Sequence, residues 1–236
     1  MASSADRMAA GAGFGALAKA DELKKRLWFT VGALIIYRLG TYLPLPGIDP
    51  GALADIFSQQ SSGILGMFDM FSGGALSRMT IFALNIMPYI TASIIMQLMT
   101  AIVPSLEALK KDGEAGRKMI NQYTRYLTVL LATVQGYGIA VGLESASGVV
   151  DDPGLFFRVT TVVTLVGGTL FLMWLGEQIT SRGVGNGISL IIFAGIVANL
   201  PTALAGTLEL GRTGALSSLL IVLLFVMAAA VIAFIV

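Results

Sequence analysis

The sequence of 236 residues contains no cysteine and no histidine. The absence of cysteine excludes disulfide bonds and thiolate metal sites, and the absence of histidine excludes the Ser-His triads of many acyl-transfer enzymes. Charged residues are also scarce: they make up 12% of the chain, against about 25% in a soluble domain. Hydrophobic residues reach 56%. We therefore predict an integral membrane protein, and we expect no enzymatic activity, no metal and no cofactor.

Long apolar runs alternate with short polar segments, a pattern that predicts a polytopic, all-α membrane protein. The predicted spans are residues 27–43, 79–103, 126–143, 157–175, 188–200 and 215–236. The other segments are an N-terminal segment at 1–26, a loop with a short helix at 44–78, and loops at 104–125 and 176–187. The last run has no closing polar flank, so we expect the native protein to continue beyond Val236.

Basic residues are distributed unequally over the two sides of the predicted spans. If the N-terminus is cytoplasmic, the outer side carries only Arg78, Arg158 and Arg212. The inner side then carries Arg7, Lys19, Lys24, Lys25, Arg26, Lys110, Lys111, Arg117, Lys118, Arg125 and Arg182. Because the cytoplasmic loops of membrane proteins are enriched in Lys and Arg, this distribution predicts a cytoplasmic N-terminus.

The second predicted span is preceded by a shorter apolar segment, residues 64–71, and the two are joined by Ser72, Gly73 and Gly74. The shorter segment cannot reach across a membrane. Because bare backbone cannot face lipid, we expect this segment in a protein-lined cavity or at the membrane interface. The span itself contains Pro88, which is expected to bend it.

Isoleucine recurs at every fourth residue in two of the predicted spans. Ile86, Ile90 and Ile94 show this spacing in the second span, and Ile188 and Ile192 repeat it in the fifth. The spacing places the side chains on one face of each helix. Two interpretations remain open. Such a face is most often lipid-facing or packed core, but it also fits a constriction of branched apolar side chains that closes a pore to water and ions.

Polar and ionisable residues within the spans are few. Asn85, Gln97 and Gln135 fit either interhelical hydrogen bonds or a route for a polar substrate. A secondary transporter, which also uses broken helices, would need ionisable residues at mid-membrane, and the spans offer almost none beyond Arg38, which lies near an end. An aspartyl intramembrane protease would need a pair of aspartates, whereas Asp69 stands alone in the short apolar segment.

Four stretches carry a family resemblance: YRLGTYLPLPGID, MFDMFSGGALSRMTIFALNIMPYITASIIMQL, KKDGEAGRKMINQYTRYLT and FLMWLGEQITSRGVGNGISLIIFAGIVANLP. Together they resemble the SecY family, the pore-forming subunits of the bacterial Sec protein translocase. The resemblance implies an all-α polytopic membrane protein with a SecY-type helical bundle. This chain would supply the first pseudo-symmetric half and the sixth transmembrane helix, with a half-length plug helix after the first span.

The resemblance also implies roles for individual residues. The pore ring of the family would include Ile86, Ile90, Ile188 and Ile192. The plug, which seals the outer funnel, would include Ile64, Leu65, Met67, Phe68, Met70, Phe71, Gly73 and Gly74. The polar lining of the lateral gate would include Ser93, Gln97 and Gln135. Asn85 occupies a position where we expect a small residue, often glycine.

The function implied by the resemblance is that of a protein-conducting channel in the bacterial plasma (inner) membrane. Such a channel passes unfolded preproteins across the membrane and releases transmembrane segments laterally into lipid. The implied partners are the SecE and SecG subunits, the SecA motor ATPase or the ribosome on the cytoplasmic side, signal sequences, nascent polypeptides and membrane lipid. No nucleic-acid site is expected in this half of the protein. The remaining ring residues and the other side of the gate are expected beyond Val236.

Overall fold

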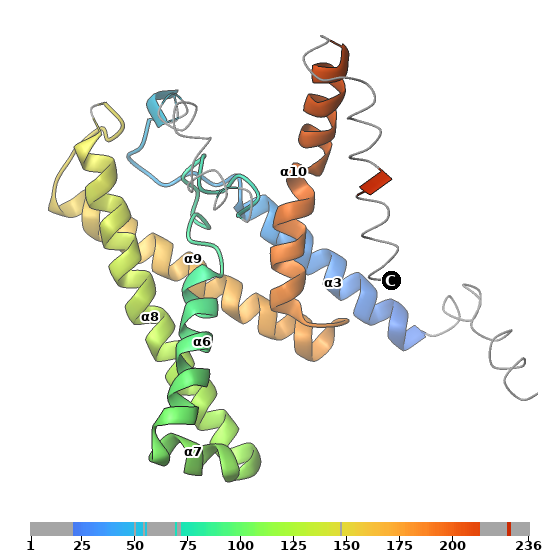
Figure 1. Ribbon diagram of the computed structural model, residues 1–236. Coiled ribbons are helices and arrows are strands. Elements are labelled where there is room, and N and C mark those ends of the chain that lie inside the picture. Colours follow the sequence, from blue (N-terminus) through green and yellow to red (C-terminus); the bar gives the residue numbers. More distant parts are fainter. Residues whose placement is uncertain are drawn as a thin grey trace, which may run out of the picture.

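The computed structural model describes residues 21–49, 51–53, 55, 69, 72–146, 148–212 and 226–227. The helices within these residues are α3 (Asp21–Gly40), α6 (Met87–Ile102), α7 (Pro104–Lys111), α8 (Gly113–Ser145), α9 (Leu155–Arg182) and α10 (Gly187–Arg212). Helix α9 lies at the centre of the arrangement (Figure 1): it contacts α8 on one side and α3 and α10 on the other, while α6 and α7 pack against α8. The predicted sixth span, 215–236, lies outside the described residues except for 226–227.

Small residues line the contacts between the helices. Buried positions of α8 recur at every fourth residue and are mostly small; they include Thr124, Thr128, Ala132, Gly136 and Ala140. Helix α6 shows the same spacing, with Pro88, Ala92, Met96 and Thr100 buried. Small side chains let membrane helices approach closely, so that van der Waals packing can hold them together. The opposite faces carry large exposed apolar side chains, which suits contact with lipid.

Three described helices are long and apolar enough to cross a membrane: α8, α9 and the Gly187–Thr207 part of α10. Helices α6 and α7 meet the same criterion as a pair, although the chain bends by 99° between them. Helix α3 has 20 residues but is not in this set, because Lys24, Lys25, Arg26 and Arg38 all lie within it.

An apolar stretch that is not helical, residues 73–86, runs between α3 and α9; we call it the entry segment. Its Phe82 ring stacks on Tyr37 of α3, with ring centroids 6.2 Å apart, and on Phe171 of α9, with centroids 5.8 Å apart. The Phe82 ring also fills the space that a side chain at Gly40 would need. Non-helical backbone is tolerated at membrane depth only where protein buries it, and the entry segment is buried in this way.

The start of the second span therefore differs from the prediction. The sequence predicts a span over 79–103, but α6 begins at Met87. Pro88 consequently lies in the first turn of α6, where its missing N–H breaks no helical hydrogen bond, and it does not bend the span as predicted. The sharp bend follows α6 instead, at Val103, which adopts an extended conformation because Pro104 comes next.

Two segments predicted as loops are largely helical. Residues 104–125 form α7 and the first turns of α8, and Glu107 and Lys111 make an ion pair of 2.7 Å one turn apart in α7. Helix α9 likewise continues to Arg182, through much of the predicted loop at 176–187. The charges in these segments indicate exposure to water rather than absence of a helix.

Candidate functional site

Three of the four predicted ring isoleucines line one cavity, which we call the isoleucine cavity. Ile86 and Ile90 come from the start of α6 and Ile192 comes from α10; Asn85 and Met87 complete the wall of a cavity of about 250 Å³. Ile86 is 1% exposed, whereas Ile90 and Ile192 are partly buried. Two segments that are far apart in sequence therefore present branched aliphatic side chains to the same space.

The fourth predicted ring residue, Ile188, is not among the residues that line this cavity. It packs against the buried cluster that contains Ile86 and Ile191, beside Gly176 of α9. Ile191 is fully buried although its spacing does not single it out, and Ile94, which continues the predicted isoleucine face, is 52% exposed. The four-residue spacing thus marks a face whose first members are enclosed and whose last member is not.

Asparagine side chains bind free amides at the start of both isoleucine-bearing helices. Asn85 Oδ1 accepts a hydrogen bond of 2.8 Å from the N–H of Ile86. Asn186 Oδ1 accepts hydrogen bonds from the N–H groups of Ile188 at 3.1 Å and Ser189 at 3.3 Å. The first N–H groups of a helix have no partner within it, and Asn186 supplies one to two of them in α10. Asn85 instead binds the N–H of Ile86, the residue directly before α6. These contacts fix the helix ends that carry the isoleucines.

Two arginines hold the Ser-Gly-Gly break. Gly73 and Gly74 have φ angles of 67° and 80°. The carbonyl oxygen of Gly73 accepts hydrogen bonds from Arg38 at 2.9 Å and Arg78 at 3.1 Å, and that of Gly74 accepts one from Arg78 at 2.8 Å. Both guanidinium groups lie over the ring of Tyr42, 5.0 and 4.4 Å from its centroid. The Ser-Gly-Gly break is therefore bound to α3 through Arg38, a contact that the sequence analysis missed.

Most of the predicted plug residues lie outside the described part of the chain: Ile64, Leu65, Met67, Phe68, Met70 and Phe71. Within the same segment the structure describes Asp69. Its carboxylate accepts hydrogen bonds from the backbone N–H of Ser77 at 2.7 Å and from the hydroxyl group of Ser72 at 3.4 Å. Asp69 thus ties the end of this segment to the start of the entry segment.

The predicted gate residues divide between two cavities. Ser93 and Gln97 lie one turn apart on α6, with Gln97 Nε2 donating to Ser93 Oγ at 3.4 Å, and both line a cavity of about 390 Å³ with Lys110 and Arg117. Gln135 of α8 lines a separate and larger cavity of about 480 Å³, which Asn85 and Met87 also reach. The structure therefore does not bring Gln135 together with the other two.

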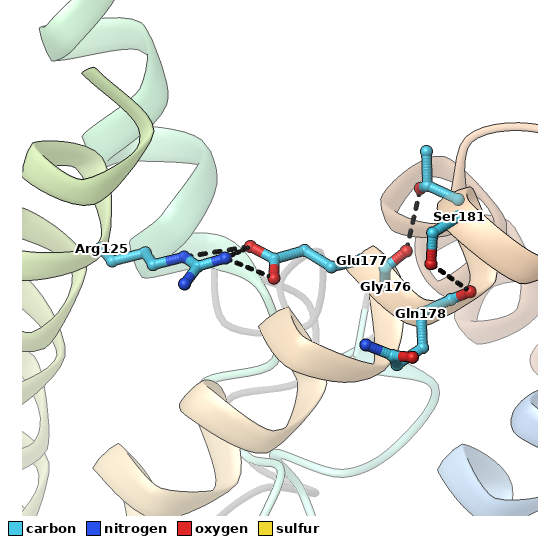
Figure 2. Close-up of polar contacts among 6 residues, drawn as sticks. Arg125, Gly176, Glu177, Gln178 and Ser181 are labelled. Atoms are coloured by element: carbon cyan, nitrogen blue, oxygen red, sulfur yellow. Dashed lines mark hydrogen bonds and ion pairs between the residues drawn. The ribbon is translucent and has the colours of Figure 1, made fainter. Parts of the chain in front are cut away.

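Two ion pairs join α8 to α9. Arg125 Nη2 contacts the two carboxylate oxygens of Glu177 at 2.7 and 2.6 Å (Figure 2). Near the other end of α8, Glu144 accepts hydrogen bonds from Arg158 Nε at 2.7 Å and from the backbone N–H of Gly154 at 2.9 Å. The sequence alone does not indicate the first pair, because its partners are 52 positions apart.

Comparison with known proteins relates these features to a family. The SecY family model matches residues 80–236. The chain is 58% identical over 218 residues to the protein translocase subunit SecY of Buchnera aphidicola subsp. Acyrthosiphon kondoi, covering 91% of this chain and 61% of that protein. It is 57% identical over 218 residues to the protein translocase subunit SecY of Escherichia coli (strain K12), covering 91% of this chain and 49% of that protein. The chain thus spans about half to three-fifths of these relatives.

A solved structure supports the same fold. Sec61 in the canine ribosome–channel complex from the endoplasmic reticulum matches with a TM-score of 0.55 and 20% identity, covering 73% of this chain and 36% of that one. The likeness confirms the predicted all-helical fold, and the comparisons do not favour a secondary transporter. The apolar helices and the SecY relatives together make this a multi-pass membrane protein. Because the family model matches well over half of the sequence, the chain belongs to the SecY family.

Proposed function

We propose that the full-length protein is the channel subunit of a Sec translocon, which passes unfolded preproteins across the bacterial plasma (inner) membrane and releases transmembrane segments into lipid. Membership of the SecY family supports this function. The single observation that carries it is the isoleucine cavity, where Ile86, Ile90 and Ile192 face one space. In this proposal the chain supplies a conduit and no catalytic group, so a motor ATPase or the ribosome supplies the driving energy.

The isoleucine cavity would act as one part of an apolar constriction. Hydrophobic constrictions close pores because water and ions leave an apolar passage. Branched aliphatic side chains form no specific hydrogen bonds, so they fit around many different polypeptide segments. In the proposal, Ile188 joins Ile86, Ile90 and Ile192 in this half's share of the ring, and a second half completes it.

The plug and the lateral gate are the moving parts of the proposal. Residues 64–71 would cover the constriction of the idle channel, and the contacts of Arg38 and Arg78 with Gly73 would hold the base of this plug. Ser93, Gln97 and Gln135 would line the gate on α6 and α8. A sufficiently apolar segment would leave through the gate, because each strongly apolar residue favours lipid by about 0.3–0.6 kcal/mol.

The proposed orientation places the N-terminus in the cytoplasm, on the basis of the Lys and Arg distribution. Residues 104–125 and the end of α9 would then face the cytoplasm. The ribosome-bound state of the canine Sec61 structure supports a docking surface for the ribosome, and the same surface would serve the SecA motor. The SecE and SecG subunits are proposed as partners within the membrane.

Ion conductance of the full-length protein in planar bilayers tests the constriction. The double variant Ile86→Gly with Ile90→Gly should raise ion leak through the idle channel, because it removes two apolar side chains from the isoleucine cavity. Ile94→Gly is the matched control, since Ile94 lies on the same helix but is 52% exposed. Equal conductance in the double variant and the control would contradict the proposal that the isoleucine cavity is part of a constriction. Cross-linking from position 86 then identifies the cargo: nascent chains for a translocon, small solutes for a transporter.

A further inference from the structure

Asn85 lies near the end of the entry segment, directly before Ile86, and it has no role in the ring itself. We propose that Asn85 is a positioning residue: its side chain fixes the start of α6, and hence Ile86, and couples both to α3 through Tyr37. The inference rests on the proposed function, because the position of Ile86 matters only if the isoleucine cavity is a constriction.

The backbone of Asn85 shows why this residue type suits the site. Its φ angle is 49°, in the left-handed region that most side chains avoid and that asparagine adopts more readily. The residue that follows, Ile86, caps α6 without a side-chain hydrogen bond, and the first N–H of the helix, that of Met87, binds the carbonyl oxygen of Leu84. Asn85 makes the turn into the helix, and its Oδ1 accepts a hydrogen bond of 2.8 Å from the N–H of Ile86.

The side chain of Asn85 also reaches a second element. It is 4% exposed, and it lies close enough to the hydroxyl group of Tyr37 to interact with it. That hydroxyl group in turn donates to the carbonyl oxygen of Ser72 at 3.4 Å. One carboxamide thus connects α6, α3 and the residue that precedes Gly73.

The surroundings of this connection are buried and closely packed. Tyr37 is 1% exposed and stacks on Phe82 of the entry segment, and its neighbour Arg38 binds the carbonyl oxygen of Gly73. Asn85 and Met87 line both the isoleucine cavity and the larger cavity beside Gln135, so they form the wall between the two. A displacement at the base of the proposed plug would therefore reach Ile86 through Tyr37 and Asn85.

Disulfide formation between Ile90→Cys and Ile192→Cys measures the geometry directly. Both positions line the isoleucine cavity, and the chain has no cysteine of its own; any cysteine in the rest of the full-length protein is replaced first. The rate of cross-linking under mild oxidant is measured in the idle channel. Asn85→Gly keeps the backbone conformation available but removes the hydrogen bond to Ile86 and the contact with Tyr37, and it should slow cross-linking by about three- to tenfold, the range expected for one buried hydrogen bond.

Tyr37→Phe tests the coupling without disturbing the aromatic stack. It should slow cross-linking in the same direction, and the double variant with Asn85→Gly should slow it no further than Asn85→Gly alone. Thr91→Ala is the matched control, because Thr91 lines the larger cavity but its hydroxyl group donates within α6, to Met87. Its rate should equal that of the parent pair. An unchanged rate in Asn85→Gly would overturn the positioning role, and additive effects of the two variants would overturn the coupling.

The measurement separates this inference from the proposed function. Cross-linking needs no substrate and no motor, so it reports on Asn85 even if the full-length protein does not conduct polypeptides. The thermal midpoint of each variant is measured alongside: a residue that only stabilises the fold would lower the midpoint without changing the cross-linking rate of folded protein, and that outcome also overturns the proposal. If Asn85→Gly does not fold, Tyr37→Phe still decides between the outcomes.

Discussion

Arg125 of α8 and Glu177 of α9 form a bidentate ion pair. Arg125 Nη2 lies 2.7 Å from Oε1 and 2.6 Å from Oε2 of Glu177, and Arg125 Nε lies 3.2 Å from Oε1. The side chains are 50% and 35% exposed. Water therefore screens the pair. Its contribution to the stability of the fold comes from its planar two-point geometry and from the two helices that it joins.

Removing this ion pair should weaken the contact between α8 and α9. A double-mutant cycle with Arg125→Ala and Glu177→Ala in the full-length protein should give a coupling of about 0.5–1 kcal/mol in the free energy of unfolding. The coupling should decrease as salt is added. Denaturant titration measures it. The control is Glu107 with Lys111, a more exposed pair within α7, for which we expect about 0.3–0.5 kcal/mol. Strictly additive effects of Arg125→Ala and Glu177→Ala would contradict the prediction.

Substitution by alanine should destabilise the protein at Gly168 of α9 but not at the neighbouring Gly167. A methyl group on Gly168 would collide with the backbone carbonyl oxygen of Ile81 in the entry segment, whereas a methyl group on Gly167 would meet open space. Gly168→Ala should therefore lower the free energy of unfolding by about 1–3 kcal/mol, and Gly167→Ala should leave it unchanged or slightly higher, because alanine favours a helix. Thermal or denaturant unfolding of the purified protein compares them. Similar stabilities of the two variants would show that α9 does not pack on the entry segment as described.

The hydroxyl group of Thr30 should stabilise the contact between α3 and the loop that joins α9 to α10. Thr30 is 6% exposed, and its Oγ1 accepts a hydrogen bond of 3.0 Å from the N–H of Val184. Thr30→Val keeps the shape but leaves that N–H without its partner, so the free energy of unfolding should fall by about 1–3 kcal/mol. Thr133→Val is the control, since Thr133 is exposed and its hydroxyl group donates to Val129 within α8. Hydrogen exchange at Val184 should quicken in Thr30→Val alone; equal exchange in both variants would refute the contact.

Hydropathy could predict where the chain is apolar but not what covers it. Helices α8, α9 and α10 each contain a predicted span and extend beyond it, because their apolar runs are continuous and helical throughout. The second half of the entry segment is also apolar, yet it is not helical, and such backbone is tolerated because protein rather than lipid surrounds it. Phe82 lies between Tyr37 and Phe171. The flanking residues Met79 and Asn85 adopt left-handed conformations, with φ angles of 43° and 49°, which sequence periodicity does not predict.

The candidate site was predictable to a similar extent. The four-residue spacing indicates that Ile86 and Ile90 share a face, and the same spacing in the fifth span singles out Ile192. The spacing cannot tell that Ile188 packs beside Gly176 instead, since this depends on how closely α9 and α10 approach. The role of Arg38 at Gly73 was not predictable for the same reason: its contact joins residues 35 positions apart.

The packing of Phe82 on Gly40 limits the substitutions that these two positions can accept. The two positions share one volume, because the aromatic ring occupies the space where a side chain at Gly40 would stand. Gly40→Ala is therefore expected to be tolerated only together with a smaller residue at Phe82. Such a paired change would also remove the stacking that connects α3 to α9. A designer who wishes to loosen the entry segment should begin with these two positions, and the change would extend to Ile86, which shares a buried cluster with Phe82.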